Sequence, residues 1–205
     1  MSSAAEHPAS ATRIIERWAV RHLGSIEHEL RVASIAMKLH DLATSRPRLD
    51  PRHRRLLVWG ALVHDVGRSV NDDRHPQIGA KMLEAAYSLP ISKADRRAVC
   101  YLTRYHRGAV PRVGKDDYLT PADDAGQVHL TLAFLRAADA LDNRNLESPR
   151  LEFASRRDRI KITATLTHDT QRARRVFKRR RKFKLLEELL GIELKVQLDV
   201  ERATV

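Results

Sequence analysis

The stretch "LVHDVGRSV" at residues 62–70 places His64 and Asp65 at the end of an apolar run, just before Gly67. Two adjacent polar side chains at such a position are costly to bury unless each has a partner. Gly67 marks the expected end of the helix that carries the pair. The stretch therefore predicts a polar site built into the core of a helical protein.

Length and composition limit the classes of protein that fit. The 205 residues are enough for one domain with a sizeable core, or for one domain with a small appendage. Cys100 is the only cysteine, which excludes an internal disulfide and, with an N-terminus unlike a secretory signal, favours the cytoplasm. No apolar stretch is long enough to span a membrane, so we expect none.

The charge is strongly positive and unevenly distributed. The chain has 38 Lys and Arg against 26 Asp and Glu, a formal net charge of +12. In "RARRVFKRRRKFK" at 172–184, nine of thirteen residues are basic. Such a balance favours a phosphate-containing ligand or another polyanion. As a helix, the run 172–184 could bind nucleic-acid phosphates, an acidic membrane surface or polyphosphate, or it could simply be a solvated face.

The hydrophobic pattern of residues 1–147 predicts a mainly α fold. Apolar residues recur at three- and four-residue spacing in six segments, at 11–23, 25–43, 51–67, 76–89, 93–106 and 127–145. Ser25 is the expected N-cap of the second helix, and Pro51 suits the first turn of the third. Residues 107–126 are rich in Gly, Pro and Asp and indicate a long surface loop, a feature often linked to function.

After residue 148 the pattern changes. Alternating apolar and polar residues predict strands at 159–167 and 192–200, with a basic helix around 170–190 between them that ends at Gly191. We therefore expect two parts, a helical bundle over 1–147 and a strand–helix–strand appendage over 148–205 packed on it. The exposed edges of this small sheet could pair two subunits into a homodimer.

Several histidines and aspartates are expected to converge inside the bundle. His28 lies on the apolar stripe of the second helix, and Asp139 on that of the last; Asp142, one turn on, competes with Asp139. His75 opens one helix and His106 closes the next. Together with the pair at 64–65, these groups suit a divalent metal such as Zn, Fe, Mn, Ni or Co, which would also compensate the buried charge.

The order of these residues resembles a known signature. His28, then "HD" at 64–65, then Asp139 resembles the H…HD…D pattern of the HD superfamily of metal-dependent phosphohydrolases, which are all-helical domains. "HPQIGAKML" at 75–83 and "YHRGAVP" at 105–111 are similar to blocks of the HD-GYP class, although the GYP triplet is missing. "LTLAFLRAADALDNRN" and the strand–helix–strand ending are most similar to the C-terminal HD domain of the exopolyphosphatase/guanosine pentaphosphate phosphatase (Ppx/GppA) family, whose ribonuclease-H-like domains this sequence does not contain.

The resemblance implies a metal site and roles for its residues. One or two divalent ions (Mn, Mg, Fe, Ni, Co or Zn) would bind, the first to His28, His64, Asp65 and Asp139, the second to Asp65, His75 and His106. Metal-activated water would attack phosphorus. The implied catalytic residues are Asp65, His75 and His106; with one ion only, the two histidines would act on the leaving group or bind phosphate. The candidate phosphate-binding residues are Arg68, Arg104, Arg107 and Arg136.

Two classes of function follow. The first is an enzyme that hydrolyses a phosphate ester or phosphoanhydride, such as a nucleotide, a guanosine alarmone or polyphosphate. The alternative is a non-catalytic regulatory module that contains a metal and binds polyphosphate, nucleic acid or a partner protein through the basic segment 172–184. Metal-dependent turnover that is lost in Asp65→Ala would favour the enzyme, and polyanion binding without turnover would favour the module.

Overall fold

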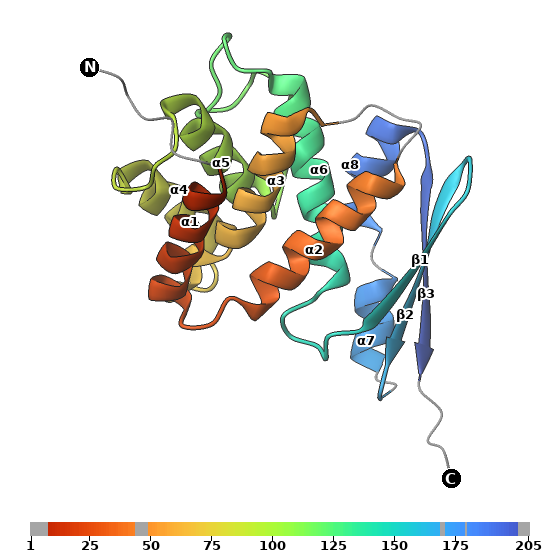
Figure 1. Cartoon of the computed structure of the whole chain (residues 1–205). Coiled ribbons are helices and arrows are strands. Elements are labelled where there is room, and N and C mark those ends of the chain that lie inside the picture. The colour runs from red at the N-terminus through yellow and green to blue at the C-terminus, as the bar shows by residue number, and fades with distance from the viewer. Residues whose placement is uncertain (1–7, 44–48, 169–170, 179, 201–205) are drawn as a thin grey trace.

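The computed structural model of the chain describes residues 8–43, 49–168, 171–178 and 180–200, and it is mainly helical, as predicted (Figure 1). The helices are α1 (Pro8–Leu23), α2 (Glu27–Leu42), α3 (Pro51–Val63), the 3-10 turn η1 (Val66–Ser69), α4 (His75–Ala85), α5 (Lys93–Tyr105), α6 (Ala125–Leu141), α7 (Gln171–Phe177) and α8 (Arg181–Leu190). The strands are β1 (Arg150–Ser155), β2 (Arg159–Leu166) and β3 (Glu193–Val200). In the part of the chain that is described, no helix is long and apolar enough to cross a membrane.

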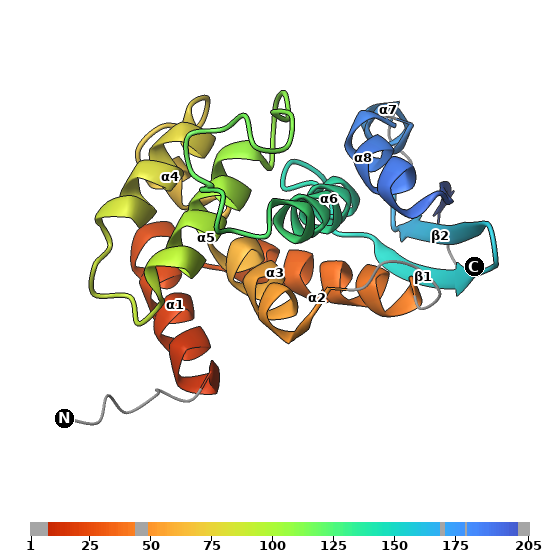
Figure 2. The same cartoon turned by 90° about the horizontal axis from the view of Figure 1, so that it is seen from above.

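The helix α6 is the centre of the molecule. Every residue from Val128 to Asp139 is buried, as expected for a helix that is apolar around most of its circumference. The helices α2, α3 and α5 pack against one side of α6, and α8 packs against another (Figure 2). This arrangement brings Asp139, near the end of α6, into the interior beside the ends of the surrounding helices.

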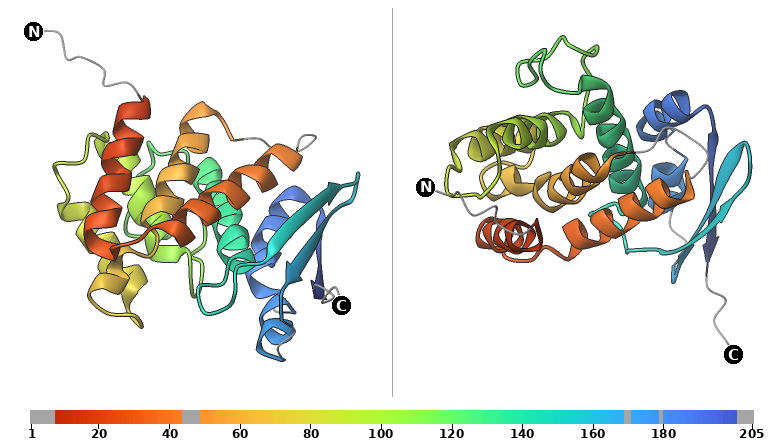
Figure 3. Two further views of the ribbon diagram at one scale, coloured as in Figure 1. Left: turned by 60° about the horizontal axis from the view of Figure 1, so that its bottom comes forward. Right: turned by 45° about the horizontal axis from the view of Figure 1, so that its top comes forward.

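The C-terminal part forms a three-stranded sheet in the order β1–β2–β3. The strands β1 and β2 pair antiparallel, and β3 pairs with β2 in parallel, with Ile162 opposite Val196. The crossover from β2 to β3 runs through α7 and α8, which lie between the bundle and the sheet (Figure 3). Phe183 and Leu186 of α8 share one buried cluster with Ile160 and Ile162 of β2. Through α8, the sheet and the bundle thus have a common core.

Several predicted helix ends are wrong. The helix α4 ends at Ala85 and α6 at Leu141, each before the predicted ends at 89 and 145. The helix α3 ends just before His64, which is its C-cap, and not at Gly67, because the 3-10 turn follows. Gly67 is instead needed where η1 packs against α4: a Cβ there would lie 2.2 Å from the carbonyl oxygen of His75. Ser25 is not the N-cap of α2, since Ile26 holds that position without a side-chain capping bond.

The C-terminal part also differs from the prediction. Strands at 159–167 and 192–200 are confirmed in position, but β1 was not predicted, and the single basic helix is two helices. Phe177 of α7 is buried with Ala173 and Leu166, whereas Phe183 of α8 belongs to the main core. Residues six apart on one straight helix project about 120° apart. A break between α7 and α8 lets both rings be buried in different clusters.

Candidate metal centre

Three histidines lie at helix ends and share one local geometry. His64 and His106 are the C-caps of α3 and α5, and His75 is the first residue of α4. In each ring, Nδ1 lies close to the backbone carbonyl oxygen three residues earlier. The distance is 2.8 Å for His64, 2.7 Å for His106 and 2.6 Å for His75. Because a carbonyl oxygen can only accept, Nδ1 carries the proton, and Nε2 of the neutral ring presents a lone pair.

His28, in the first turn of α2, is fixed in the same way by a carboxylate. Its Nδ1 donates to Oδ2 of Asp142 at 2.8 Å, and Oδ1 of Asp142 accepts a bond from Nε of Arg31 at 3.0 Å. Asp142, the expected competitor of Asp139, therefore orients His28 from behind and also braces an arginine. Within the described residues, Nε2 of His28 and Nε2 of His64 are buried without a hydrogen-bond partner.

Asp65 lies among the rings of His75 and His106. Its Oδ1 is 3.1 Å from Nε2 of His75 and 3.5 Å from Nε2 of His106, and the two Nε2 atoms are 3.2 Å apart. Ligand atoms bound to one ion at about 2.0–2.2 Å lie roughly 3.0–3.5 Å from one another. We call Asp65, His75 and His106 the tight group, because its spacing is already that of ligands around a single ion.

The distances between the other ligand-type atoms of the cluster are longer. Oδ1 of Asp139 is 3.7 Å from Nε2 of His28 and 3.8 Å from Nε2 of His64. Asp65 lies 3.7 Å from the His64 nitrogen and 3.9 Å from the His28 nitrogen. We call His28, His64, Asp65 and Asp139 the open group. The structure thus brings all six predicted ligand-type side chains into one buried cluster.

The carboxylates of this cluster are ionised. Burial alone would raise the pKa of Asp65, but the neighbouring imidazoles of His64, His106 and His75 outweigh burial and hold this pKa far below its usual range. Burial would also raise the pKa of Asp139, yet the nearby Lys182 and His28 lower it well below the usual value. Two buried negative charges therefore require compensating positive charge.

The histidines differ in their protonation. Burial would lower the pKa of His28, but the carboxylates of Asp139 and Asp142 raise it to about 9. Burial lowers the pKa of His106 to about 4, so this ring is neutral at neutral pH. Without a metal, a proton on His28 supplies part of the positive charge that the open group requires.

These residues fit a divalent metal ion. Two overlapping sets could each hold one, His28 with His64 and Asp65, and Asp65 with His75 and His106. A ring whose Nδ1–H is bound to a carbonyl or carboxylate while Nε2 faces the site is the usual arrangement of a metal-ligating histidine. Nitrogen and carboxylate oxygen ligands suit several first-row ions, and the set does not select one of them.

Two cations at the cluster were not expected from the sequence. Nε of Arg144 donates to Oδ2 of Asp65 at 3.0 Å, and the same guanidinium pairs with the buried Glu29. Lys182 of α8 pairs with Oδ2 of Asp139. Neither contact has a periodic signal in the sequence, since each joins distant segments. Lys182 lies in the basic run, so the C-terminal part contributes a side chain to the site.

Three of the four predicted phosphate-binding arginines lie beside the cluster. Arg68, Arg104 and Arg107 line a pocket of about 470 Å³, which we call the metal-side pocket because His75 also lines it. Nε of Arg68 donates to Oδ2 of Asp65 at 2.6 Å. Asp72 and Asp73 line the pocket too, and Arg68 also pairs with Asp72, so an anion next to the cluster would meet carboxylates as well as guanidinium groups.

The fourth arginine has a different environment. Arg136 is buried on α6, and its guanidinium donates to the carbonyl oxygens of Tyr105 at 2.5 Å and Gly108 at 3.0 Å. Arg136 does not line the metal-side pocket. Its hydrogen bonds hold the end of α5 and the start of the following loop against α6.

The sequence also matches a known family. The model of the HD domain family aligns with residues 25–144, which is more than half of the chain. The matched range includes both groups of the cluster, from His28 to Asp139. The chain belongs to the HD domain family.

Proposed function

We propose that this protein is a metal-dependent phosphohydrolase that hydrolyses a phosphate ester or a phosphoanhydride. The observation that carries the proposal is the convergence of four histidine Nε2 atoms on the ionised carboxylates of Asp65 and Asp139. Membership of the HD domain family supports it, because this superfamily consists largely of metal-dependent phosphohydrolases.

In this proposal the open group holds the first ion and the tight group a second. Divalent ions in such sites polarise phosphoryl oxygens and activate water for attack on phosphorus. Asp142 and three backbone carbonyls keep Nδ1 of each ring protonated, which leaves Nε2 for the ion. The ion would be Mn, Mg, Fe, Ni, Co or Zn, with one or two bound per chain.

The substrate phosphate would occupy the metal-side pocket. Arg104 and Arg107 present guanidinium donors there, and such groups bind phosphate oxygens in bidentate fashion. Arg68 lies beside them but already pairs with Asp65 and Asp72. The charge that builds up on these oxygens in the transition state would be stabilised by the same donors. If only one ion binds, His75 and His106 would face the leaving group or the phosphate instead.

The candidate substrates are a nucleotide, a guanosine alarmone and polyphosphate. This set follows from the resemblance to the exopolyphosphatase/guanosine pentaphosphate phosphatase family and from the positive charge of the chain. We expect the protein to act in the cytoplasm, since the single cysteine, Cys100, excludes an internal disulfide.

The test is phosphate release by purified protein. The chain is loaded with Mn, Mg, Fe, Ni, Co or Zn in turn and incubated with p-nitrophenyl phosphate, nucleotides, guanosine tetraphosphate and polyphosphate. We expect metal-dependent release that falls to background in Asp65→Asn, which keeps the size of the side chain. Asp123→Asn, which removes an ionised carboxylate paired with Arg97 outside the cluster, is the control. Metal-loaded protein that releases no phosphate from any of these compounds would contradict the proposal.

A further inference from the structure

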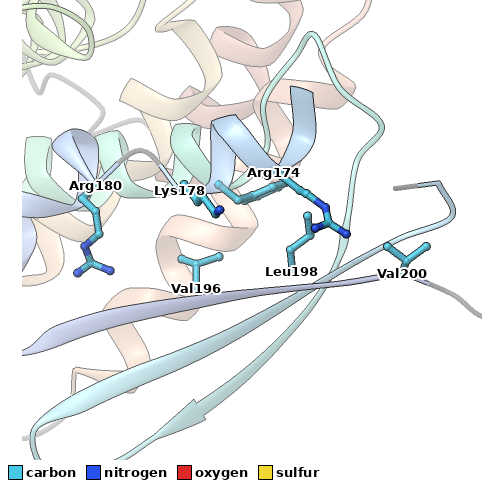
Figure 4. A pocket seen from close by; sticks show the side chains of 7 residues that line it. Arg174, Lys178, Arg180, Val196, Leu198 and Val200 are labelled. Atoms are coloured by element: carbon cyan, nitrogen blue, oxygen red, sulfur yellow. The ribbon is translucent and has the colours of Figure 1, made fainter. Parts of the chain in front are cut away.

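The basic run 172–184 is divided among three surroundings. Side chains on one side of α7 and after it (Arg174, Lys178 and Arg180) lie over Val196 and Leu198 of β3 (Figure 4). Lys182 reaches Asp139 in the metal centre. Arg172 and Arg175, on another side of α7, line a separate pocket of about 450 Å³. The described basic side chains of this segment thus point to several places, and all of them except Lys182 are exposed.

We call this separate pocket the arginine pocket. Residues of both the C-terminal part and the helical bundle line it. Arg172, Arg175 and Val176 come from α7, Asn143 and Asn145 from the turn after α6, and Arg107 from the loop after α5. Arg107 and Asn145 also line the metal-side pocket. The two pockets are therefore neighbours that share these two lining residues.

In the part of the chain that the structure describes, the charge of the arginine pocket has no internal counterpart. Within the described residues, no carboxylate forms an ion pair with Arg107, Arg172 or Arg175; the contact found is a weak one from Nε of Arg175 to the backbone oxygen of Gln171 at 3.4 Å. Three guanidinium groups around one pocket repel one another unless an anion lies between them. The amide groups of Asn143 and Asn145 add neutral hydrogen-bonding capacity. This combination suits an oxyanion, and phosphate in particular.

We propose that the arginine pocket binds a second phosphate group of the substrate, while the phosphate to be cleaved lies in the metal-side pocket. This proposal rests on the proposed function. It defines the substrate class as molecules with at least two phosphate groups, either linked in a chain or attached to separate positions of a nucleoside. A simple phosphate monoester occupies the metal-side pocket alone and gains nothing from α7.

The test compares two double variants of the full chain with equal loss of charge. R172A/R175A removes both α7 arginines of the pocket, and R174A/K178A removes two basic groups of the same segment that face β3. Isothermal titration calorimetry on metal-free protein measures the Kd of inorganic tripolyphosphate, adenosine 3′,5′-bisphosphate and inorganic phosphate. Circular dichroism and the metal content after reloading verify that both variants are folded.

We expect R172A/R175A to raise the Kd of a probe with two or more phosphates at least about tenfold, since the variant removes charge-assisted hydrogen bonds to the second phosphate. R174A/K178A should change it less than about twofold. If R172A/R175A raises only the Kd of tripolyphosphate, the pocket recognises phosphates linked in a chain. If it raises only the Kd of the bisphosphate, the pocket recognises phosphates attached to separate positions. Equal weakening in both variants, or none in R172A/R175A, would overturn the proposal.

The binding measurement separates this proposal from the proposed function. If tripolyphosphate binds through Arg172 and Arg175 but no compound is hydrolysed with any metal, the phosphate-binding pocket stands and the hydrolase fails. If metal-dependent phosphate release is found while binding of every probe is indifferent to these arginines, the hydrolase stands and the second subsite is overturned.

Discussion

The open group and the tight group share Asp65 but differ in spacing and in charge. Ligand atoms of the tight group are 3.1–3.5 Å apart, whereas the neighbouring atoms of the open group are separated by 3.7–3.9 Å. The open group contains two ionised carboxylates, and the tight group contains only the shared one. Spacing therefore favours the tight group, and charge favours the open group.

The difference indicates an order of metal binding. Two carboxylates supply more negative charge to a divalent ion in a buried site than one does, although Arg68, Arg144 and Lys182 also pair with them. Closing a gap of a few tenths of an ångström needs only small side-chain movements, while an uncompensated buried charge costs several kcal/mol. We therefore expect the open group to bind the first ion tightly and the tight group to bind the second more weakly.

The largest effect is expected from removing the second carboxylate. Asp139→Asn keeps the shape of the open group but takes away one negative charge, so the affinity for the first ion should fall more than about 100-fold, beyond the usual loss for an outer-shell change. Competition with a metal-sensitive dye measures it, and phosphate release should fall in parallel. Asp123→Asn is the control. Unchanged affinity in Asp139→Asn would remove the distinction between the groups.

The double variant H75A/H106A tests the other group. Because both rings belong only to the tight group, the variant should retain one equivalent of metal and lose the second. Metal analysis after dialysis gives the stoichiometry, and H129A is the control, as His129 is a buried histidine bound to Tyr101 away from the cluster. Loss of all metal in H75A/H106A would mean that the two groups form one indivisible site.

A smaller effect on metal affinity is expected from a residue that orients a ligand without contacting the ion. Asp142→Asn removes the carboxylate that orients His28, and loss of such a partner lowers metal affinity about 10- to 100-fold. The first ion should be affected and the second should not. Stepwise titration with the dye distinguishes the two ions, and Asp95→Asn, which breaks a pair with Arg52 elsewhere, is the matched control. An equal loss at both steps would show that Asp142 supports the fold and not the open group.

The smallest effect on metal binding is expected from a change in the backbone that positions His75. Gly67→Ala would drive a Cβ against the carbonyl oxygen of His75, so we expect a loss of about 1–3 kcal/mol in the free energy of unfolding and weaker binding of the second ion. Urea denaturation measures the first quantity. Gly126→Ala meets only Asp124 Oδ1 at 3.5 Å and should be neutral or stabilising. Equal stability of Gly67→Ala and the wild type would contradict the close approach.

The fold of the bundle was largely predictable because its helices carry a local signal. In α6 the apolar residues cover nearly the whole circumference, which indicates a central helix, and in α2 they form one stripe. The ligand-type residues could also be identified, because each histidine or aspartate lies inside such a stripe or directly at its end. Local periodicity is sufficient to tell which residues face inward.

The parts that could not be predicted depend on contacts between distant segments. Arg144 reaches Asp65 and Lys182 reaches Asp139 from turns and helices whose own sequence has no sign of the contact. The break between α7 and α8 follows from the burial of Phe177 and Phe183 in different clusters, which is decided by the sheet and by α6. The role of Gly67 likewise depends on the position of α4.

The most direct test of the account is the metal content of protein purified without chelators, with Asp65→Ala measured beside the wild type. Asp65 is the one side chain that both groups share. We expect one or two equivalents in the wild type, essentially none in Asp65→Ala, and circular dichroism typical of a folded helical protein in both. No metal in the wild type, even after incubation with Mn, Fe, Ni and Zn, would contradict the metal centre and with it the proposed hydrolase.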